Sequence, residues 1–293
     1  MGPSSDYNQA DHAAQALTRM PNASRQSSQA CAVRLGKLVL QSMSMEDLLT
    51  HSGHELKHVA TVNSEIFTYA HENPAYEAIL RRTVNTIDGR IVQWFCSLLY
   101  PGKTLRKLSG SDFIYNLADH ASARQERLFL LGAESESNRG TIEVLKRRCP
   151  GLMVEGYSPR FCSNIEDREW NEEILGRIAR FEPKHLAVCF GPVKQEMWIT
   201  QNRDRLVQLG VRGAYGLGGT LDFVSGRKKR APRWMQLAGV EWLFRLFTEK
   251  GRLRRTGKMF KMPYFILKFF QRESEMLGQS GSVGPQMSGA REC

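Results

Sequence analysis

Uninterrupted runs of apolar residues alternate with segments of helical spacing along most of this chain. The runs over 127–133 (RLFLLGA) and 185–191 (HLAVCFG) contain no polar side chain after their first position. Such runs are typical of strands that are buried on both faces of a sheet. The apolar pattern predicts strands over 33–41 (a strand or a hairpin), 57–63, 127–133, 152–158, 185–191 and the start of 211–226.

The segments between these runs have the 3.6-residue period of amphipathic helices, most clearly over 170–182 (WNEEILGRIARFE). Ser44 begins a Ser-Met-Glu-Asp capping pattern, and Pro150-Gly151 stops a helix over 141–149. Further helices are predicted over 45–51, 64–83, 89–100 and 194–209. This alternation predicts an α/β fold, with a Rossmann-like, mainly parallel sheet and helices on both faces.

Composition divides the chain of 293 residues into four parts. Residues 1–30 and 273–293 are polar and poor in apolar side chains, which predicts disorder. Residues 31–226 are the predicted α/β core, and residues 227–272 are a basic, amphipathic helical appendage.

Positive charge is concentrated in that appendage. Residues 227–272 contain 14 Lys or Arg and two acidic residues, whereas the rest of the chain contains 27 basic and 28 acidic residues. A local positive field indicates a polyanionic partner, either nucleic acid or anionic lipid headgroups.

Targeting signals and cysteine spacing point to the cytoplasm. The N-terminal residues lack the basic and apolar regions of a signal peptide, and no run of 18 apolar residues is present. We therefore expect neither a cleaved leader nor a transmembrane helix. The six cysteines form no CxxC pair and no Cys/His cluster, so we expect reduced thiols rather than a zinc site or disulfides.

In open parallel sheets, ligands bind beyond the carboxyl ends of the strands. Four such ends are polar or glycine-rich here, at 61–63, 131–133, 190–195 and 216–219. Gly216-Leu-Gly-Gly219 offers backbone N–H groups to a phosphate, with a plain strand-to-helix turn as an equal alternative. The segment matches neither GxGxxG nor GxxxxGK[ST], which argues against a Rossmann dinucleotide site and a P-loop.

Single polar residues near these ends have structural and catalytic interpretations. Asp88 precedes Gly89, so it suits a turn, or a general base for a substrate hydroxyl. Glu196 and Asp222 are explained as acids at helix starts, and Gln195 could hydrogen-bond a nucleobase or a sugar. His51 and His54, with His58 beyond them, have the spacing of one helical face. Without a carboxylate pattern, a solvated face is favoured over a metal site.

Eight segments in order resemble the bacterial glycosyltransferase family named for WecG, TagA and CpsF. Each motif is weak alone, but their order over about residues 33–256 is specific. They are Thr61-Val-Asn-Ser-Glu65, Ile87-Asp-Gly89, Gly110-Ser-Asp112, Phe129-Leu-Leu-Gly132, Gly191-Pro-Val-Lys-Gln-Glu196, Gly216-Leu-Gly-Gly-Thr-Leu-Asp-Phe223, Lys229-Arg-Ala-Pro-Arg-Trp234 and Gly239-Val-Glu-Trp-Leu-Phe-Arg-Leu246.

The resemblance implies transfer of a sugar from a UDP-sugar to a polyprenyl-diphosphate-linked saccharide, with inversion and without a metal ion or cofactor. Asp88 matches the general base, and Thr61, the second implied catalytic residue, matches a pocket residue near the donor. The tail arginines would approach the diphosphate. Arg90 after Asp88 and Pro192 after Gly191 depart from the family pattern, which leaves the donor open between N-acetylmannosamine and glucose. The implied substrate-binding residues are Asn63, Gly191, Lys194, Gln195, Glu196, Gly216, Gly218, Gly219, Asp222, Arg245, Arg252 and Arg255.

The basic tail also carries aromatic residues, which predicts docking on an anionic membrane. We expect a peripheral protein on the cytoplasmic face of the plasma membrane, with Met259–Phe270 as the lipid anchor and Trp234–Leu246 partly packed on the core. The alternatives are a nucleic-acid-binding protein, a non-catalytic membrane scaffold, and a homo-oligomer that buries the tail in its interface. No helix-turn-helix, RRM or zinc-finger signature supports the nucleic-acid alternative.

Overall fold

The structure, a computed structural model, describes residues 31–51, 53–232, 234–235, 241–248, 257 and 260–269. The two segments predicted to be disordered lie outside these residues. Within the described residues, no helix combines the length and the apolar character that crossing a bilayer requires.

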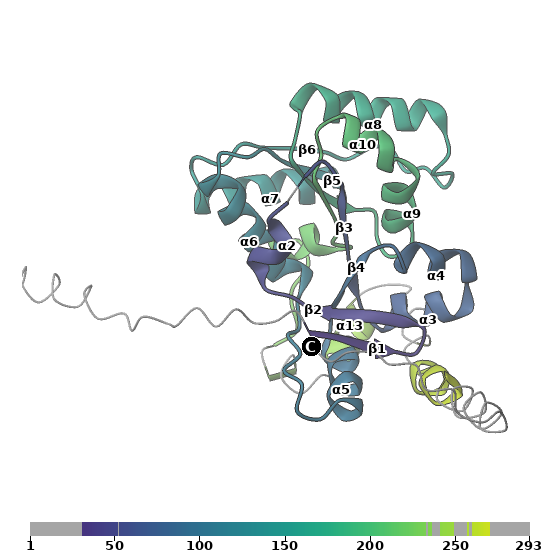
Figure 1. The fold of residues 1–293 in the computed structure, drawn as a ribbon. Coiled ribbons are helices and arrows are strands. Elements are labelled where there is room, and N and C mark those ends of the chain that lie inside the picture. Colours follow the sequence, from purple (N-terminus) through teal and green to yellow (C-terminus); the bar gives the residue numbers. More distant parts are fainter. Residues whose placement is uncertain are drawn as a thin grey trace, which may run out of the picture.

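One eight-stranded sheet forms the centre of the described part, in the order β1-β2-β4-β3-β8-β7-β5-β6 (Figure 1). All neighbouring pairs are parallel except β1 and β2, which form an antiparallel hairpin at one edge. The strands are β1 (Cys31–Leu35), β2 (Leu38–Ser42), β3 (Lys57–Val62), β4 (Val84–Ile87), β5 (Leu128–Gly132), β6 (Val154–Tyr157), β7 (His185–Cys189) and β8 (Gly213–Gly216).

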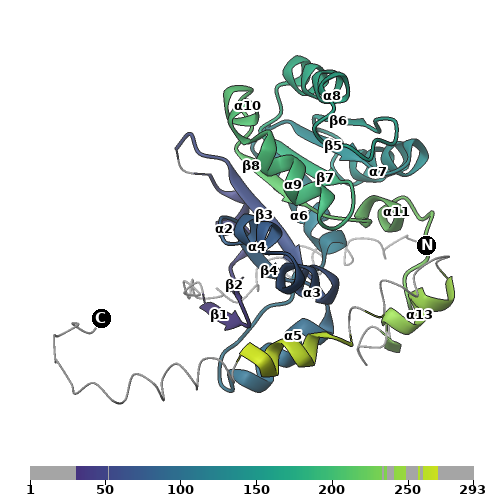
Figure 2. The same ribbon diagram turned by 90° about the vertical axis from the view of Figure 1, so that its right-hand side faces the viewer.

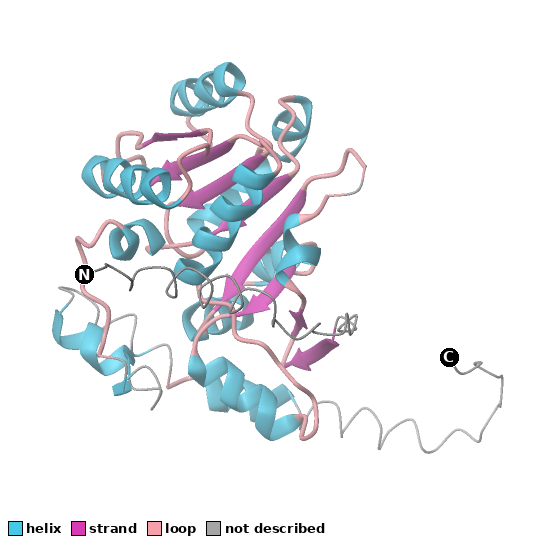
Figure 3. Cartoon of the chain, turned by 90° about the vertical axis from the view of Figure 1, so that its left-hand side faces the viewer, coloured by secondary structure: helices cyan, strands magenta, loops and turns pink. Residues whose placement is uncertain are grey.

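Helices cover both faces of this sheet (Figures 2 and 3), because side chains along each buried strand alternate between two cores. On β5, Leu128 and Leu130 face one core, whereas Phe129 and Leu131 face the other. The first core is closed by α2 (Met45–Leu49), α6 (Gly110–Ala123), α7 (Ser135–Arg148) and α11 (Thr220–Val224). The second is closed by α8 (Arg168–Phe181), α9 (Lys194–Gln201) and α10 (Arg203–Gln208).

A third core lies under the hairpin end of the sheet. It contains apolar side chains of β1 and β2 together with α3 (Ser64–Glu72), α4 (Pro74–Leu80) and α5 (Arg90–Leu99). A short helix over 262–269 contributes Met262 and Ile266 to the same core. Part of the C-terminal region therefore packs on the body of the protein. Helix α13 (Glu241–Thr248) lies in the sequence between α11 and this short helix.

The predicted fold class is confirmed, and several predicted elements appear with small shifts. The 33–41 segment is the β1–β2 hairpin, and Ser44 caps α2 by accepting a hydrogen bond from the Asp47 N–H. The single helix predicted over 64–83 is wrong, because Asn73 ends α3 and caps α4 before Pro74. The helix predicted over 194–209 is likewise divided, into α9 and α10.

Two elements that frame the site had no clear signal in the sequence. Strand β4 has only four residues, and its Asn85 and Thr86 are buried. Asn85 is satisfied there by donating hydrogen bonds to the Leu80 and Val39 carbonyls. Helix α6 begins at Gly110 after a connection whose Lys107 forms a parallel bridge with Ile87.

Candidate active site

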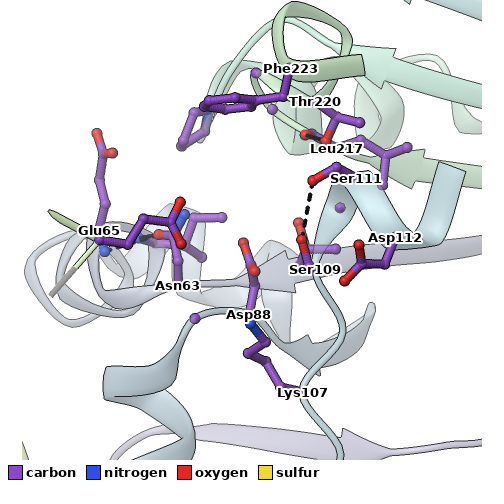
Figure 4. A pocket seen from close by; sticks show the side chains of 18 of the residues that line it. Asn63, Glu65, Asp88, Lys107, Ser109, Ser111, Asp112, Leu217, Thr220 and Phe223 are labelled. Carbon is purple, nitrogen blue, oxygen red and sulfur yellow. Dashed lines mark hydrogen bonds between the residues drawn. The ribbon is translucent and has the colours of Figure 1, made fainter. Parts of the chain in front are cut away.

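A cavity of about 170 Å³ lies beyond the carboxyl ends of β3, β4 and β8 (Figure 4). At this point the chain leaves β3 for β4 on one side, whereas β8, β7 and β5 extend on the other. Such a reversal of strand order opens a crevice between the connections. Thr61, Asn63, Asp88, Gln195, Gly218 and Gly219, from the predicted site, all line this cavity.

Asp88 follows the last residue of β4. Its backbone N–H donates to the Val62 carbonyl at 2.9 Å, which fixes the main chain at the strand end. Gly89 has φ +85°, a left-handed conformation that turns the chain into α5. The Asp88 side chain is half-buried and extends into the cavity between Asn63 and Ser109 (Figure 4).

Thr61 and Asn63 are held by local hydrogen bonds at the end of β3. The buried Thr61 hydroxyl donates to the Gly216 carbonyl at 2.9 Å, which ties β3 to β8 beside the cavity. The Asn63 Oδ1 accepts from the backbone N–H groups of Glu65 and Ile66, so Asn63 caps α3. Its oxygen is thereby occupied, whereas the residue still lines the cavity.

Gln195 and Glu196 form one buried unit under the glycine-rich turn. The Gln195 Oε1 accepts from the Gly218 N–H at 2.9 Å, and its Nε2 donates to Glu196 at 2.7 Å. Glu196 is fully buried and also accepts from the Tyr76 hydroxyl and from the Val193 N–H. Burial raises the pKa of Glu196, although these hydrogen bonds oppose the shift. Of this pair, only Gln195 lines the cavity.

The acceptor role of Glu196 has a consequence at Val193. Val193 has φ +74°, which is a strained conformation for a β-branched residue. The 2.8 Å hydrogen bond from its N–H to Glu196 holds the loop in this shape, next to Pro192 on the cavity wall.

The glycines of 216–219 have different reasons to be glycine. A Cβ on Gly216 would lie 2.7 Å from Glu196 Oε1 and 2.8 Å from Gln195 Nε2, so this position requires close backbone approach. Gly218 has φ +58°, and Gly219 precedes α11 with open space around it. Leu217, Gly218 and Gly219 line the cavity, and Gly216 lies behind them.

Three basic side chains on the cavity wall had received no individual role from the sequence: Lys107, Lys228 and Arg230. Arg230 donates to the hydroxyls of Ser109 and Ser111 and lies 3.5 Å from the Asp112 carboxylate. The segments Gly110-Ser-Asp112 and Lys229–Trp234 carry part of the family resemblance, but their residues were not among the predicted site residues. Glu65, Phe223 and Glu241 also line the cavity without having been predicted to bind substrate.

Besides Glu196 and Gly216, three further predicted site residues lie outside the cavity wall. Lys194 donates to the Cys162 carbonyl and stacks over the rings of Trp170 and Phe190, in the second core. Asp222 accepts from the Ser137 hydroxyl at 2.7 Å and pairs with the Lys228 ammonium at 2.5 Å. Asp222 therefore positions a cavity cation rather than facing the cavity. Gly191 supplies a left-handed turn, with φ +87°, before Pro192.

Of the three predicted tail arginines, only Arg245 lies in a segment that the structure describes. Glu241, at the start of α13, lines the cavity, so the appendage contributes to its wall. Arg245 lies on α13, four residues further along. Arg252 and Arg255 lie outside the described residues.

The opposite, amino-terminal end of the sheet holds a second polar cluster. Within the part of the chain that the structure describes, His120, Glu126 and His185 have ligand atoms within 4.8 Å of one another, the spacing of a metal site. The Glu126 carboxylate is already bonded to His185 Nε2 and to Lys184 Nζ, each at 2.6 Å. These groups are remote from Asp88, because His185 starts β7 and Asp88 follows β4.

The predicted solvated histidine face is wrong. Helix α2 ends at Leu49, so His51 and His54 lie beyond it, and His58 lies in β3. Burial lowers the pKa of both His51 and His58 to about 3. His51 instead bonds to the Tyr215 hydroxyl at 3.0 Å.

Comparison with known proteins gives one family. The model of the glycosyl transferase WecG/TagA/CpsF family matches residues 33–277, which is most of the chain. A Bacillus spizizenii protein named N-acetylglucosaminyldiphosphoundecaprenol N-acetyl-beta-D-mannosaminyltransferase is 33% identical over 217 residues, covering 73% of this chain and 79% of that protein.

Proteins with the same name occur in other bacteria. The Bacillus subtilis (strain 168) protein is 29% identical over 73% of this chain and 79% of its own length. The Staphylococcus aureus (strain MRSA252) protein is 28% identical over 72% of this chain and 78% of its own length.

Proposed function

Because this chain belongs to the WecG/TagA/CpsF family of glycosyl transferases, we propose that it transfers a sugar from a UDP-sugar to a polyprenyl-diphosphate-linked saccharide. The name shared by its relatives favours N-acetylmannosamine as the sugar and an N-acetylglucosaminyl diphosphate lipid as the acceptor. The reaction inverts the anomeric carbon and uses no metal ion. The enzyme works peripherally on the cytoplasmic face of the plasma membrane.

One observation carries this proposal: a carboxylate and several cations share one cavity at the switch point of the sheet. Asp88 extends into the cavity, and Lys107, Lys228 and Arg230 lie on its wall. A carboxylate in this position suits a general base, and fixed cations suit a diphosphate leaving group.

The reaction then needs one displacement. Asp88 accepts the proton of the acceptor hydroxyl. As the proton leaves, the oxygen of that hydroxyl bonds to the anomeric carbon of the donor. The bond from that carbon to the UDP oxygen breaks, and the electron pair leaves with UDP. The cavity cations stabilise the negative charge that develops on the diphosphate, a task that a bound metal ion can also perform.

Other predicted residues support this chemistry by position. Gln195 accepts a hydrogen bond from the Gly218 N–H, and Asp222 pairs with the Lys228 ammonium at 2.5 Å. Both residues therefore position groups on the cavity wall that would face the donor. Arg245, Arg252 and Arg255 belong to the same proposal, as cations that the appendage brings to the diphosphate.

The test is UDP release by the full chain with several UDP-sugars and a polyprenyl-diphosphate-linked N-acetylglucosamine acceptor. We expect release with UDP-N-acetylmannosamine that depends on the acceptor and persists in a chelator. Release that the chelator abolishes and a divalent ion restores would overturn metal independence. Absence of release with every donor would overturn the proposed reaction.

A further inference from the structure

Helix α5 begins two residues after Asp88 and exposes large apolar side chains. Its inner face places Val92 and Cys96 in the third core. Its outer face presents Trp94 and Leu98, each 61% exposed, one turn apart and one turn after the exposed Arg90. A surface helix of a globular protein normally turns such residues inward. The outer face of α5 therefore needs an explanation.

The helix over 262–269 repeats this arrangement at the same end of the molecule (Figures 1 and 2). Met262 and Ile266 are buried in the core that also holds Val92 and Cys96. The predicted Met259–Phe270 anchor is thus partly internal packing. Phe265 packs against the same core, whereas Phe260, Tyr264 and Leu267 are each more than half exposed.

Charge is one-sided around these two helices. Residues 89–111, which contain α5, include four basic residues and no acidic one: Arg90, Lys103, Arg106 and Lys107. Residues 260–269 add Lys261 and Lys268, again without an acidic residue. Glu72 of α3 bonds to Lys261 at 2.6 Å, so one of these cations is paired. Exposed aromatic residues among cations are typical of surfaces that lie in the headgroup region of an anionic membrane.

Building on the proposed function, we propose that the outer face of α5, extended by the helix over 262–269, is the surface on which the enzyme meets the bilayer and along which the polyprenyl chain of the acceptor leaves the active site. We call this set the lipid face: Arg90, Trp94, Leu98, Phe260, Tyr264 and Leu267.

The position of α5 supports this path. Gly89 lines the cavity and caps α5, so the first turn of the helix starts at the cavity wall. At a rise of 1.5 Å per residue, Trp94 lies roughly 6 Å and Leu98 roughly 12 Å along the axis from Arg90. An acceptor whose saccharide reaches Asp88 then has its diphosphate near the start of α5, and its hydrocarbon chain meets Trp94 and Leu98.

A second copy of the chain is the competing occupant of this surface. Two copies joined through the lipid face would bring Arg90 and the cations in the adjoining sequence, such as Lys103 and Lys268, toward the same cations of the second copy, which disfavours association. An anionic bilayer instead gains from the same charges, at about 1 kcal/mol per Lys or Arg near its surface. The charge pattern therefore favours the membrane.

The first experiment measures binding of the full chain to phosphatidylglycerol and to phosphatidylcholine vesicles. We expect Trp94→Ser with Leu98→Ser to weaken phosphatidylglycerol binding at least about tenfold, because two apolar side chains leave the interface. The matched control removes two exposed apolar residues elsewhere, Met153→Ser with Phe161→Ser, and should bind as the parent does. Lys103→Gln removes a cation and should lower the affinity for phosphatidylglycerol vesicles about fivefold, without changing the affinity for phosphatidylcholine vesicles.

The second experiment compares two acceptors, one with the long polyprenyl chain in vesicles and one with a short, water-soluble alkyl chain. The Trp94/Leu98 variant should lose turnover on the long-chain acceptor and keep it on the soluble one. Equal loss on both acceptors, or vesicle binding equal to that of the parent, would overturn the lipid face. A parent dimer in light scattering that the variant converts to a monomer would assign the surface to a second copy.

The two proposals fail differently. If the parent releases no UDP with either acceptor but its vesicle binding still depends on Trp94 and Leu98, the proposed reaction is wrong and the membrane surface stands. If the parent is active on both acceptors and the variant matches it throughout, the reaction stands and the lipid face is wrong.

Discussion

The two ends of the central sheet are both polar, but they are built in opposite ways. At the carboxyl end, Asp88 and its neighbours surround a cavity of about 170 Å³. At the amino end, His51, Tyr215, His185 and Glu126 are joined directly to one another in one chain of hydrogen bonds. One end leaves polar groups facing open space, and the other uses polar groups to fill the core.

The hydrogen-bond chain at the amino end can be followed proton by proton. Burial opposes ionisation of Glu126, yet hydrogen bonds from Lys184 and His185 hold its pKa below the usual range, so it is an acceptor. His185 therefore donates through Nε2 and accepts the Tyr215 proton at Nδ1. Tyr215 in turn accepts from His51 Nε2. Every proton is committed to structure, and this end is suited to stability rather than to catalysis.

The largest expected effect is at the open end. Asp88→Asn removes the proposed base but keeps the shape of the side chain. We expect turnover to fall by about 10²–10⁴-fold, the usual contribution of a general base. The free energy of unfolding should change little, because the side chain is half-buried and its backbone bond to Val62 remains.

The control for Asp88→Asn is Asp112→Asn, another carboxylate on the same cavity wall. It should cost far less turnover, because the Asp112 carboxylate lies 3.5 Å from the Arg230 guanidinium and is not the proposed base. UDP release and urea unfolding of both variants give the comparison. Equal losses of turnover would remove the special role of Asp88.

The next effect concerns the packing of Gly216 against Gln195 and Glu196 beneath the cavity. Gly216→Ala places a Cβ within 3 Å of both Gln195 and Glu196, whose side chains are buried and bonded. We expect a loss of about 1–3 kcal/mol in the free energy of unfolding, as for other overpacked cores. Gly219→Ala has open space and should lose less than about 1 kcal/mol. Urea unfolding measures both, and similar losses would contradict the packing argument.

The same contrast explains what could be predicted from the sequence. The carboxyl end is marked by local signals, since Thr61 and Asn63 end the run over 57–63, Asp88 precedes Gly89, and the 216–219 turn is glycine-rich. The amino end has no such signal, because His51, His185 and Tyr215 are brought together from three distant segments by the strand order. The sequence predicted a solvated face for His51 and gave no role to His185 or Tyr215, because their contacts exist only in the assembled sheet.

Within the site, the differences between the predicted and the observed positions of residues have the same origin. Lys194 was placed in the cavity by its neighbours in sequence, but the helical rotation at the start of α9 turns it toward the rings of the second core. Lys107 and Arg230 were missed because β4 and the start of α6 were not predicted. The bridge from Ile87 to Lys107 brings that connection to the cavity.

A smaller effect is expected at the closed end. Tyr215→Phe removes the hydroxyl that links His51 and His185 and leaves two buried ring nitrogens without their partner. We expect the free energy of unfolding to fall by about 1–2 kcal/mol, with turnover on the lipid-linked acceptor unchanged. Tyr76→Phe is the matched control, since it removes a hydroxyl bonded to Glu196 under the site. It should lower both quantities. A loss of turnover in Tyr215→Phe would show that the two ends are coupled.

The smallest effect at neutral pH concerns His58, which lies in β3 with its Nε2 buried and without a hydrogen-bond partner. Burial lowers its pKa to about 3, against about 6.5 in the unfolded chain. The unfolded state therefore takes up a proton as the pH falls below about 6.5, whereas the folded state does not until about 3. His58 thus costs up to about 1.4 kcal/mol of stability per pH unit across that window.

His58→Leu should match the parent near pH 7.5 and unfold at higher urea than the parent at pH 5. Parallel pH profiles for His58→Leu and the parent would mean that β3 opens enough to let His58 ionise, and the closed end of the sheet would not be as rigid as its hydrogen bonds suggest.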